Sequence, residues 1–252
     1  MKALFKTALI STALLAGAPA LAQTVLNKDN PEGYQQFKTD YVEMVETANP
    51  TTLSWRMFYV EPSKGPDAKW FDAIKQGNLE LVKQMLKDGQ NIEAKDEAAL
   101  GQTALGWAAF IGNEELVDFL LEQNADLFGT DRGDVSNALK SAGLGANVKV
   151  FKKLHERLKD KVDINDQKND AQGETLLIVA ASNGRYEIVE YLLENGANPN
   201  LVTTIKDPKD HAYDQDALTF ACERGQAKVI GLLLKHGAVN HRTGKPSCDY
   251  AK

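Results

Sequence analysis

The stretch Gly101–Asp131, GQTALGWAAFIGNEELVDFLLEQNADLFGTD, decides the fold. A short helix is expected around the paired alanines Ala108 and Ala109, and Gly112 breaks it. Glu114–Glu122 then has apolar residues at helical spacing, which predicts a second helix with one apolar stripe. Two short helices cannot bury such a stripe alone, so the unit is expected to pack against copies of itself.

Copies of this pattern occur along most of the chain. Each copy has a large apolar residue, then a pair of mostly small residues, and then a closing small residue. The first positions of the five copies are Trp70, Leu105, Leu139, Leu177 and Leu218, which are 35, 34, 38 and 41 residues apart. Five copies in phase predict a repeat protein in which each unit contacts only its neighbours.

Two short motifs connect the copies to a known family. Thr103-Ala104-Leu105-Gly106 stands where ankyrin repeats have T-P-L-H, and NGANPN (195–200) and HGAVN (236–240) match their G-A-D-x-N end. The sequence resembles the ankyrin-repeat family over residues 67–252, although no copy keeps the proline or the histidine of T-P-L-H. The resemblance implies an all-α solenoid of five helix-turn-helix repeats with hairpin fingers, followed by a partial C-terminal repeat.

Residues 1–22 have the features of a secretory signal peptide. Lys2 and Lys6 precede an apolar run at 7–18, and an A-x-A pattern ends at Ala22, which makes Gln23 the first mature residue. A retained membrane anchor is the alternative, but the apolar run is short for a membrane span. The segment resembles Gram-negative bacterial signals, so we expect the mature protein in the periplasm, without membrane attachment.

Residues 23–66 do not follow the repeat and are expected to form an N-terminal capping segment. Pro31–Ala48 is predicted to be a helix with one apolar face, and Leu53–Val60 (LSWRMFYV) is too aromatic to be solvated. The ends of a solenoid need a cover for the stacking face, so this segment is expected to cover the first repeat. The alternative is that Trp55–Val60 docks onto a partner.

The charge balance narrows the class of partner. Without the signal peptide, the chain has 27 Lys and Arg residues against 35 Asp and Glu residues, a net charge of −8. Nucleic acids and anionic membrane surfaces require a basic footprint, so the composition argues against both. A protein partner with a basic surface would fit.

The chain has two cysteines, Cys222 and Cys248. Cys222 occupies the second small position of its copy, and Cys248 takes the leucine position of the partial last repeat. Since adjacent ankyrin helices lie about 10 Å apart, two buried thiols are favoured over a disulfide, which stays the alternative. A zinc site with His236 and His241 lacks recognisable ligand spacing, so we expect no metal and no other cofactor.

Two regions depart from the regular repeat. The sequence SAGLGA at 141–146 has two glycines, which indicates either a drifted repeat or a bend in the array. The longest spacing comes from about eight residues added in Leu201–Asp214, and such insertions often lie on the binding face of repeat proteins. Functionless lengthening of a surface loop is the alternative.

No catalytic motif is present in the sequence. It lacks G-x-S-x-G, a glycine-rich phosphate loop, H-E-x-x-H and C-x-x-C. We therefore expect no enzymatic activity and look for function in surface recognition.

In ankyrin proteins, the concave face is built from the fingers and the first helix of each repeat. By this resemblance, the two residues before each closing glycine face the groove. The candidate binding residues are Lys75, Gln76, Phe110, Ile111, Ser182, Asn183, Glu223 and Arg224 on the helices, with Leu100, Gln102, Gln172 and Glu174 on the fingers. Phe110 with Ile111 is the candidate anchor. The alternative is that Phe110 packs on a neighbouring finger or under the N-terminal cap. Trp107 is expected in the core between the two helices of its repeat.

These features predict a non-enzymatic protein-binding module in the periplasm. Some secreted bacterial ankyrin proteins are associated with periplasmic catalase, so the resemblance implies support of a resident enzyme in peroxide defence. The alternative is an immunity protein that neutralises a toxic effector delivered to the periplasm.

Overall fold

The structure, a computed structural model, describes residues 63–131, 135–210 and 212–249. These residues form ten α-helices in five antiparallel pairs and no named strand. The five-repeat, all-α solenoid expected from the sequence is therefore confirmed for the described part of the chain. The expected signal peptide and residues 23–62 of the expected capping segment lie outside it.

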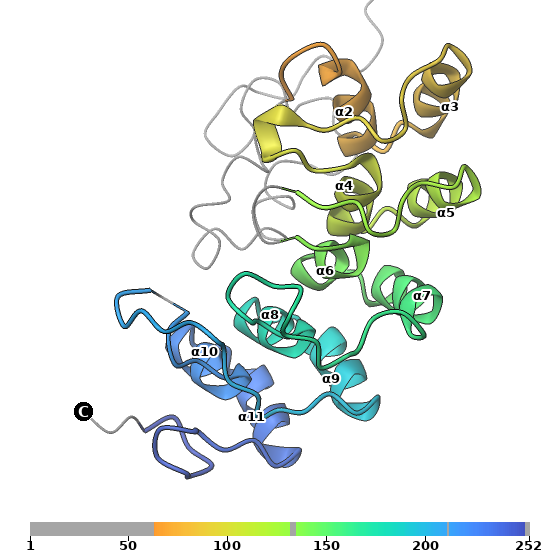
Figure 1. Cartoon of the computed structure of the whole chain (residues 1–252). Helices are drawn as coiled ribbons and strands as arrows, with labels where there is room; N and C mark the ends of the chain where they lie inside the picture. The colour runs from red at the N-terminus through yellow and green to blue at the C-terminus, as the bar shows by residue number, and fades with distance from the viewer. Residues whose placement is uncertain (1–62, 132–134, 211, 250–252) are drawn as a thin grey trace, which may run out of the picture.

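Each repeat contributes one inner and one outer helix. The pairs are α2 (Ala68–Lys75) with α3 (Leu79–Lys87), α4 (Ala104–Ile111) with α5 (Glu114–Glu122), α6 (Ala138–Leu144) with α7 (Val148–Leu158), α8 (Leu176–Ser182) with α9 (Tyr186–Glu194), and α10 (Ala217–Glu223) with α11 (Ala227–Lys235). A short 3-10 helix, η2 (Glu97–Ala99), lies in the first finger. The array is curved, with the inner helices α2, α4, α6, α8 and α10 on the inside of the curve (Figure 1), and we call this side the concave face.

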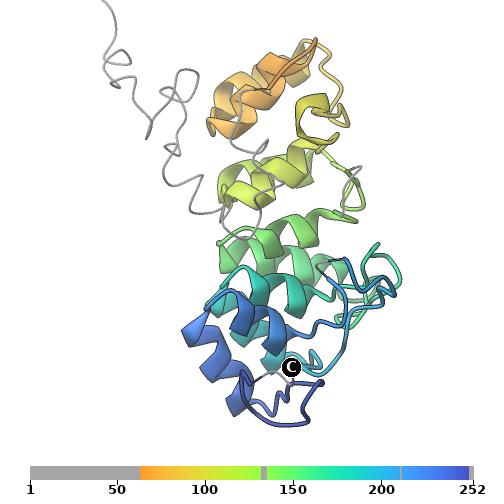
Figure 2. The ribbon, with the colours of Figure 1, turned by 90° about the vertical axis from the view of Figure 1, so that its left-hand side faces the viewer.

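Contacts between successive inner helices hold the array together. Each inner helix packs against the next one, and each outer helix covers the back of its own pair. Small residues permit this close packing: Ala108 and Ala109 of α4 and Ala180 and Ala181 of α8 are all at most 1% exposed. Trp107 is completely buried, as expected. In Figure 2 the inner helices lie one below another on the side facing the viewer.

Polar caps define where most helices begin. The first backbone N–H groups of a helix have no partner inside it, and a side-chain oxygen just before the helix can accept one of them. The inner helices α4, α6, α8 and α10 are capped in this way by Thr103, Asn137, Thr175 and Asp216. The outer helices α3, α5 and α7 are capped by Asn78, Asn113 and Asn147. These repeats lack the proline of T-P-L-H, and a side-chain cap defines the start of the inner helix instead.

The irregular third repeat contains a site of close backbone approach. A Cβ atom added to Gly145 would lie 2.3 Å from the carbonyl oxygen of Phe110 in the preceding inner helix. A Cβ atom added to Gly143 would lie 3.5 Å from the Phe151 ring, at ordinary contact distance. Hence the absence of a side chain at Gly145 allows α6 to approach α4, so this glycine has a structural role.

This difference predicts opposite effects of two alanine substitutions. Gly145→Ala should destabilise the protein by about 1–3 kcal/mol, since a backbone oxygen cannot easily move aside. Gly143→Ala, inside α6, should be neutral or stabilise it by roughly 0.5–1 kcal/mol. Thermal and urea unfolding of both variants measures the difference. Equal destabilisation by the two substitutions would contradict the assignment of Gly145.

An aromatic cluster joins the outer helices α7 and α9. The Nδ1 atom of His155 lies 2.8 Å from the hydroxyl oxygen of Tyr191, and Phe151 meets the Tyr191 ring edge to face at 6.0 Å. His155 is 7% exposed. Burial lowers the pKa of His155, while the charge of Glu156 acts in the opposite direction. The folded protein therefore favours the neutral imidazole.

Acidification should destabilise the protein through His155. In the unfolded chain the imidazole binds a proton with a pKa of roughly 6.5, more readily than in the folded protein. The contribution of His155 to stability is full above that pH and declines as the pH falls below it. His155→Gln should remove this part of the pH dependence in urea unfolding between about pH 5.5 and 7.5. The matched control is His236→Gln, because His236 is exposed; a loss of pH dependence in the control alone would contradict the prediction.

Candidate functional site

The twelve residues expected on the concave face differ in their exposure. Five are buried: Lys75, Gln102, Phe110, Ser182 and Asn183. Six are half-buried: Gln76, Leu100, Ile111, Gln172, Glu174 and Arg224. Glu223 is exposed. The expectation of an open surface is therefore wrong for the five buried residues.

Phe110 does not present an exposed ring. Its side chain is 2% exposed and meets Trp107 edge to face, with the ring centroids 6.1 Å apart. It lies in the continuous apolar core, and the neighbouring Ile111 packs against that core. Phe110 is therefore part of the core, and the expected exposed anchor is wrong.

Lys75 is buried because its charge is compensated inside the fold. Its Nζ atom lies 3.2 Å from Asp96 Oδ2, donates to Ser63 Oγ at 2.6 Å, and stands 4.2 Å above the centre of the Trp107 ring. The same carboxylate oxygen accepts from Trp107 Nε1 at 3.0 Å. A buried charge is tolerated only with such partners. Lys75 therefore joins α2 to the first finger.

The other buried polar candidates also have bonds within the fold. Gln102 donates to Ser141 Oγ at 3.3 Å and accepts from the amide of Thr103 at 2.9 Å. Ser182 and Asn183 both donate to the carbonyl oxygen of Val179, at 3.0 and 2.8 Å. These groups stabilise helix ends and finger contacts.

The concave face is most open at its C-terminal end. The Arg224 guanidinium lies 4.9 Å from the centre of the Phe220 ring, on the last inner helix. Burial lowers the pKa of Arg224, whereas the nearby charges of Glu174 and Glu223 raise it. Glu223 accepts a hydrogen bond from Gln215 Nε2 at 2.8 Å. An arginine stacked on a ring beside two carboxylates forms a charged surface that is already ordered.

The inserted segment Leu201–Asp214 adds to this open end. The amide of Thr203 donates to the carbonyl of Gln215 at 2.8 Å, and the amide of Thr204 donates to Gln172 in the preceding finger at 2.9 Å. Tyr213 is 37% exposed on this segment. The insertion thus extends the fingers as a loop that hydrogen bonds hold in place. It also exposes the Tyr213 ring, which the sequence analysis did not name as a candidate.

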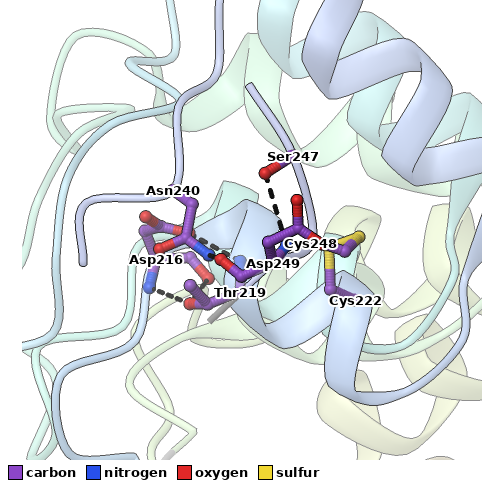
Figure 3. The surroundings of a disulfide bond; sticks show 7 residues. All are labelled: Asp216, Thr219, Cys222, Asn240, Ser247, Cys248 and Asp249. Atoms are coloured by element: carbon purple, nitrogen blue, oxygen red, sulfur yellow. Dashed lines mark hydrogen bonds between the residues drawn. A yellow bond between two sulfur atoms is a disulfide. The ribbon is translucent and has the colours of Figure 1, made fainter. Parts of the chain in front are cut away.

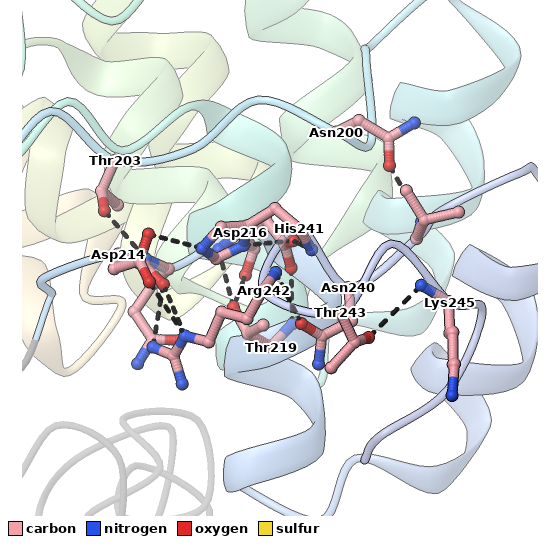
Figure 4. Close-up of polar contacts among 12 residues, drawn as sticks. Asn200, Thr203, Asp214, Asp216, Thr219, Asn240, His241, Arg242, Thr243 and Lys245 are labelled. Atoms are coloured by element: carbon pink, nitrogen blue, oxygen red, sulfur yellow. Dashed lines mark hydrogen bonds and ion pairs between the residues drawn. The ribbon is translucent and has the colours of Figure 1, made fainter. Parts of the chain in front are cut away.

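A polar network fastens the inserted segment to the C-terminal turn (Figure 4). His241 contacts Asp216 Oδ2 through Nδ1 at 2.8 Å and Asp214 Oδ1 through Nε2 at 2.6 Å. The Arg242 guanidinium donates through Nη2 to the backbone carbonyl of Asp214 at 2.8 Å. The spacing of the repeats could not reveal this network, because its partners are more than twenty residues apart.

This network contains the same residue types, Asp and His, as many catalytic sites, but their arrangement is different. Both ring nitrogens of His241 contact carboxylate oxygens, so both are engaged in bonds within this network. Among the described residues, no group of three or more His, Cys, Asp or Glu side chains is arranged to hold a metal ion. The contacts of this network join the inserted segment to the C-terminal turn.

Cys222 and Cys248 form a disulfide (Figure 3), so the expectation of two buried thiols is wrong. Their Cα atoms are 5.6 Å apart, within the usual range for a disulfide. The expected distance assumed that Cys248 lies on a further inner helix. Instead, residues 240–249 form a turn with no helix, and the turn returns to α10. Cys222 is half-buried and Cys248 is exposed.

Reduction should loosen the C-terminal end of the solenoid. The disulfide closes a loop with a sequence separation of 26 residues, for which chain entropy predicts about 3.5 kcal/mol of stabilisation. We expect a lower melting temperature for Cys222→Ser, Cys248→Ser and faster amide exchange in residues 240–249. Unchanged exchange in this turn would contradict the prediction.

Comparison with known proteins defines the class. The family model for ankyrin repeats (three copies) matches residues 70–166 and 131–203. The chain therefore belongs to the ankyrin-repeat family, whose repeats generally mediate protein–protein interactions.

Relatives differ widely in their overall size and described role. The chain is 30% identical over 145 residues to the mitochondrial disaggregase of Bos taurus, covering 56% of this chain and 20% of that protein. It is 32% identical over 138 residues to the ankyrin repeat domain-containing protein SAT10 of Stachybotrys chartarum, covering 54% and 7%. It is 29% identical over 136 residues to a protein of Rickettsia felis named for its ankyrin repeats, covering 52% and 42%. The chain spans less than half the length of each.

Proposed function

We propose that this chain is a non-enzymatic protein-binding module whose contact surface is the C-terminal part of the concave face. One observation carries the proposal. At equivalent positions of successive inner helices, Lys75, Phe110, Leu144 and Ser182 are between 1% and 4% exposed, whereas Glu223 is exposed. A protein partner can contact the inner-helix surface most readily where it opens, at α10.

Side chains at this end have the chemistry of an interface. Tyrosine and arginine are enriched among residues that dominate binding energies. Tyr213 lies on the ordered inserted segment, and Arg224 is held over the Phe220 ring. Both are positioned before a partner arrives, which lowers the entropy cost of association.

The partner surface is expected to be basic. The two fingers at this end, residues 163–174 and 201–216, have eight acidic residues and three lysines. Complementary charge speeds association and excludes wrong partners. Asp170 and Asp216 are buried in contacts within the fold, so the other six acidic residues of these fingers are available to suit a basic protein patch.

The proposed location is the periplasm. The N-terminal sequence supports export, because it has the charged start, apolar run and A-x-A pattern of a signal peptide. The disulfide supports it as well, since disulfides persist in oxidising compartments and are rare in the cytosol. In this setting we propose support of a resident enzyme, such as a catalase in peroxide defence. An immunity role against a delivered toxin would use the same surface.

Affinity capture tests this function at the level of single residues. The mature protein, Gln23–Lys252, is used to capture partners from a periplasmic extract of its source, with and without peroxide stress. Tyr213→Ser should lower the recovery of the specific partner at least about tenfold, the effect expected if Tyr213 is a hot spot of the interface. Quantitative mass spectrometry reads the recovery and names the partner, which separates a resident enzyme from a toxin.

Tyr186→Ser is the matched control, because Tyr186 and Tyr213 are both 37% exposed and Tyr186 lies on the outer helix α9. Capture should be unchanged in this variant. Loss of capture in Tyr186→Ser with none in Tyr213→Ser would place the interface on the outer helices and contradict the proposal.

A further inference from the structure

His241 lies between two carboxylates at the C-terminal end of the solenoid (Figure 4). Its Nδ1 atom is 2.8 Å from Asp216 Oδ2, and its Nε2 atom is 2.6 Å from Asp214 Oδ1. An ionised carboxylate only accepts hydrogen bonds, so each ring nitrogen must have a proton to make its bond. Both nitrogens have protons only in the positively charged imidazolium. The two contacts together therefore require the charged form of His241.

The two carboxylates differ in their surroundings. The Asp216 side chain is 0% exposed, caps α10, and also accepts from the backbone amide of His241 at 3.1 Å. A buried carboxylate is costly without its donors, so we expect the Nδ1 proton to stay on Asp216 in both charge states of the ring. The Asp214 side chain is 39% exposed, and water can replace a lost donor there. His241 should therefore lose its proton to water from Nε2, which turns a nitrogen lone pair toward Asp214.

Asp214 connects this contact to the exposed aromatic ring of the inserted segment. Its backbone φ is 55°, in the left-handed region that is uncommon for residues with a side chain. Contacts of its side chain help to hold it in this conformation. The residue before it is Tyr213, which is 37% exposed. A change in the hold on Asp214 is therefore passed to Tyr213 through a single peptide bond.

Two further charged side chains belong to this cluster. Arg242 contacts Asp214 Oδ2 through Nε at 3.2 Å, and its Nη1 atom lies 3.6 Å from Glu223 Oε1 on α10. Arginine keeps its charge in proteins, whereas histidine is the residue type whose charge normally changes between about pH 5 and 8. When His241 is neutral, Arg242 still holds Asp214, but the segment has one bond fewer.

We propose that His241 is a pH-sensitive switch for the binding surface at Tyr213. The charged imidazole holds Asp214, and with it Tyr213, in place, and the neutral imidazole releases the Asp214 side chain. This inference rests on the proposed function, because it names how that surface is regulated. The surface is ordered at acidic pH and loosens as the pH rises. His155 has the opposite effect, because acid destabilises the fold through it, so the two histidines differ in sign.

Amide hydrogen exchange in the full mature chain, Gln23–Lys252, tests the switch without a partner. The amide of Thr203 donates to the Gln215 carbonyl at 2.8 Å, and the amide of Gln215 donates to Thr203 Oγ1 at 3.1 Å. Their exchange is resolved by NMR at about pH 5.5 and 8 and divided by the intrinsic rate at each pH. We expect protection at both amides to fall at least about threefold at the higher pH, as for the loss of one hydrogen bond. Protection in α5 is the internal reference and should not fall.

Two variants assign the effect to one histidine. In His241→Gln the side chain has no charge to lose, so protection should no longer fall as the pH rises. His236→Gln, at an exposed histidine, is the matched control and should keep the fall of the unmodified protein. Equal protection at the two pH values in the unmodified protein, or the same fall in His241→Gln, would overturn the inference. Either result leaves the capture experiment on Tyr213 standing, and unchanged capture by Tyr213→Ser would count against the proposed function alone.

Discussion

Close contact between successive inner helices is the constraint on which the rest of the structure depends. No repeat can bury its own apolar stripe, so each helix pair needs a neighbour at short distance. Paired alanines provide that distance at α4 and α8, and Gly145 provides it where α6 meets the backbone of α4. The array is stable only as a continuous stack, and an error at one contact separates the repeats on either side.

Side-chain bonds between repeats reinforce this stack along its edges. In the fingers, the amide of Asn198 donates to Asn165, and the amide of Val239 donates to Asn200. Buried ion pairs, Lys75 with Asp96 and Lys140 with Asp170, join inner helices to the following finger. The two finger bonds span 33 and 39 residues, about one repeat, and this fits the nearest-neighbour energetics of solenoids. The fingers are therefore held as part of the framework, and a surface built on them is ordered in advance.

The sequence predicted the features that recur with the repeat. The bounds of α5 followed from apolar spacing, and Trp107 is buried as expected. Features that depend on contacts between residues far apart in the sequence could not be predicted from the repeat pattern. The burial of Phe110 depends on the approach of α6, which its local pattern does not contain. The disulfide depends on the path of residues 240–249, which turn back to α10 where another helix was expected.

The same distinction applies to the candidate site. The 41-residue spacing showed where the insertion lies, but its orientation comes from His241 and Arg242 in the C-terminal turn. These contacts add to the bonds that Thr203 and Thr204 make with Gln215 and Gln172. The disulfide, the histidine network and the inserted segment thus form one ordered end of the solenoid, which is where the inner-helix surface becomes accessible.

Hydroxyl-radical footprinting of the mature protein tests the central claim most directly, namely that the inner-helix surface is buried at α4. Phe110 and Phe128 have the same intrinsic reactivity and are 2% and 42% exposed, so their oxidation rates compare exposure alone. The account predicts that Phe128 is oxidised many times faster than Phe110, in line with these fractions. Equal rates for the two phenylalanines would mean that the groove is open at α4 and would contradict the account.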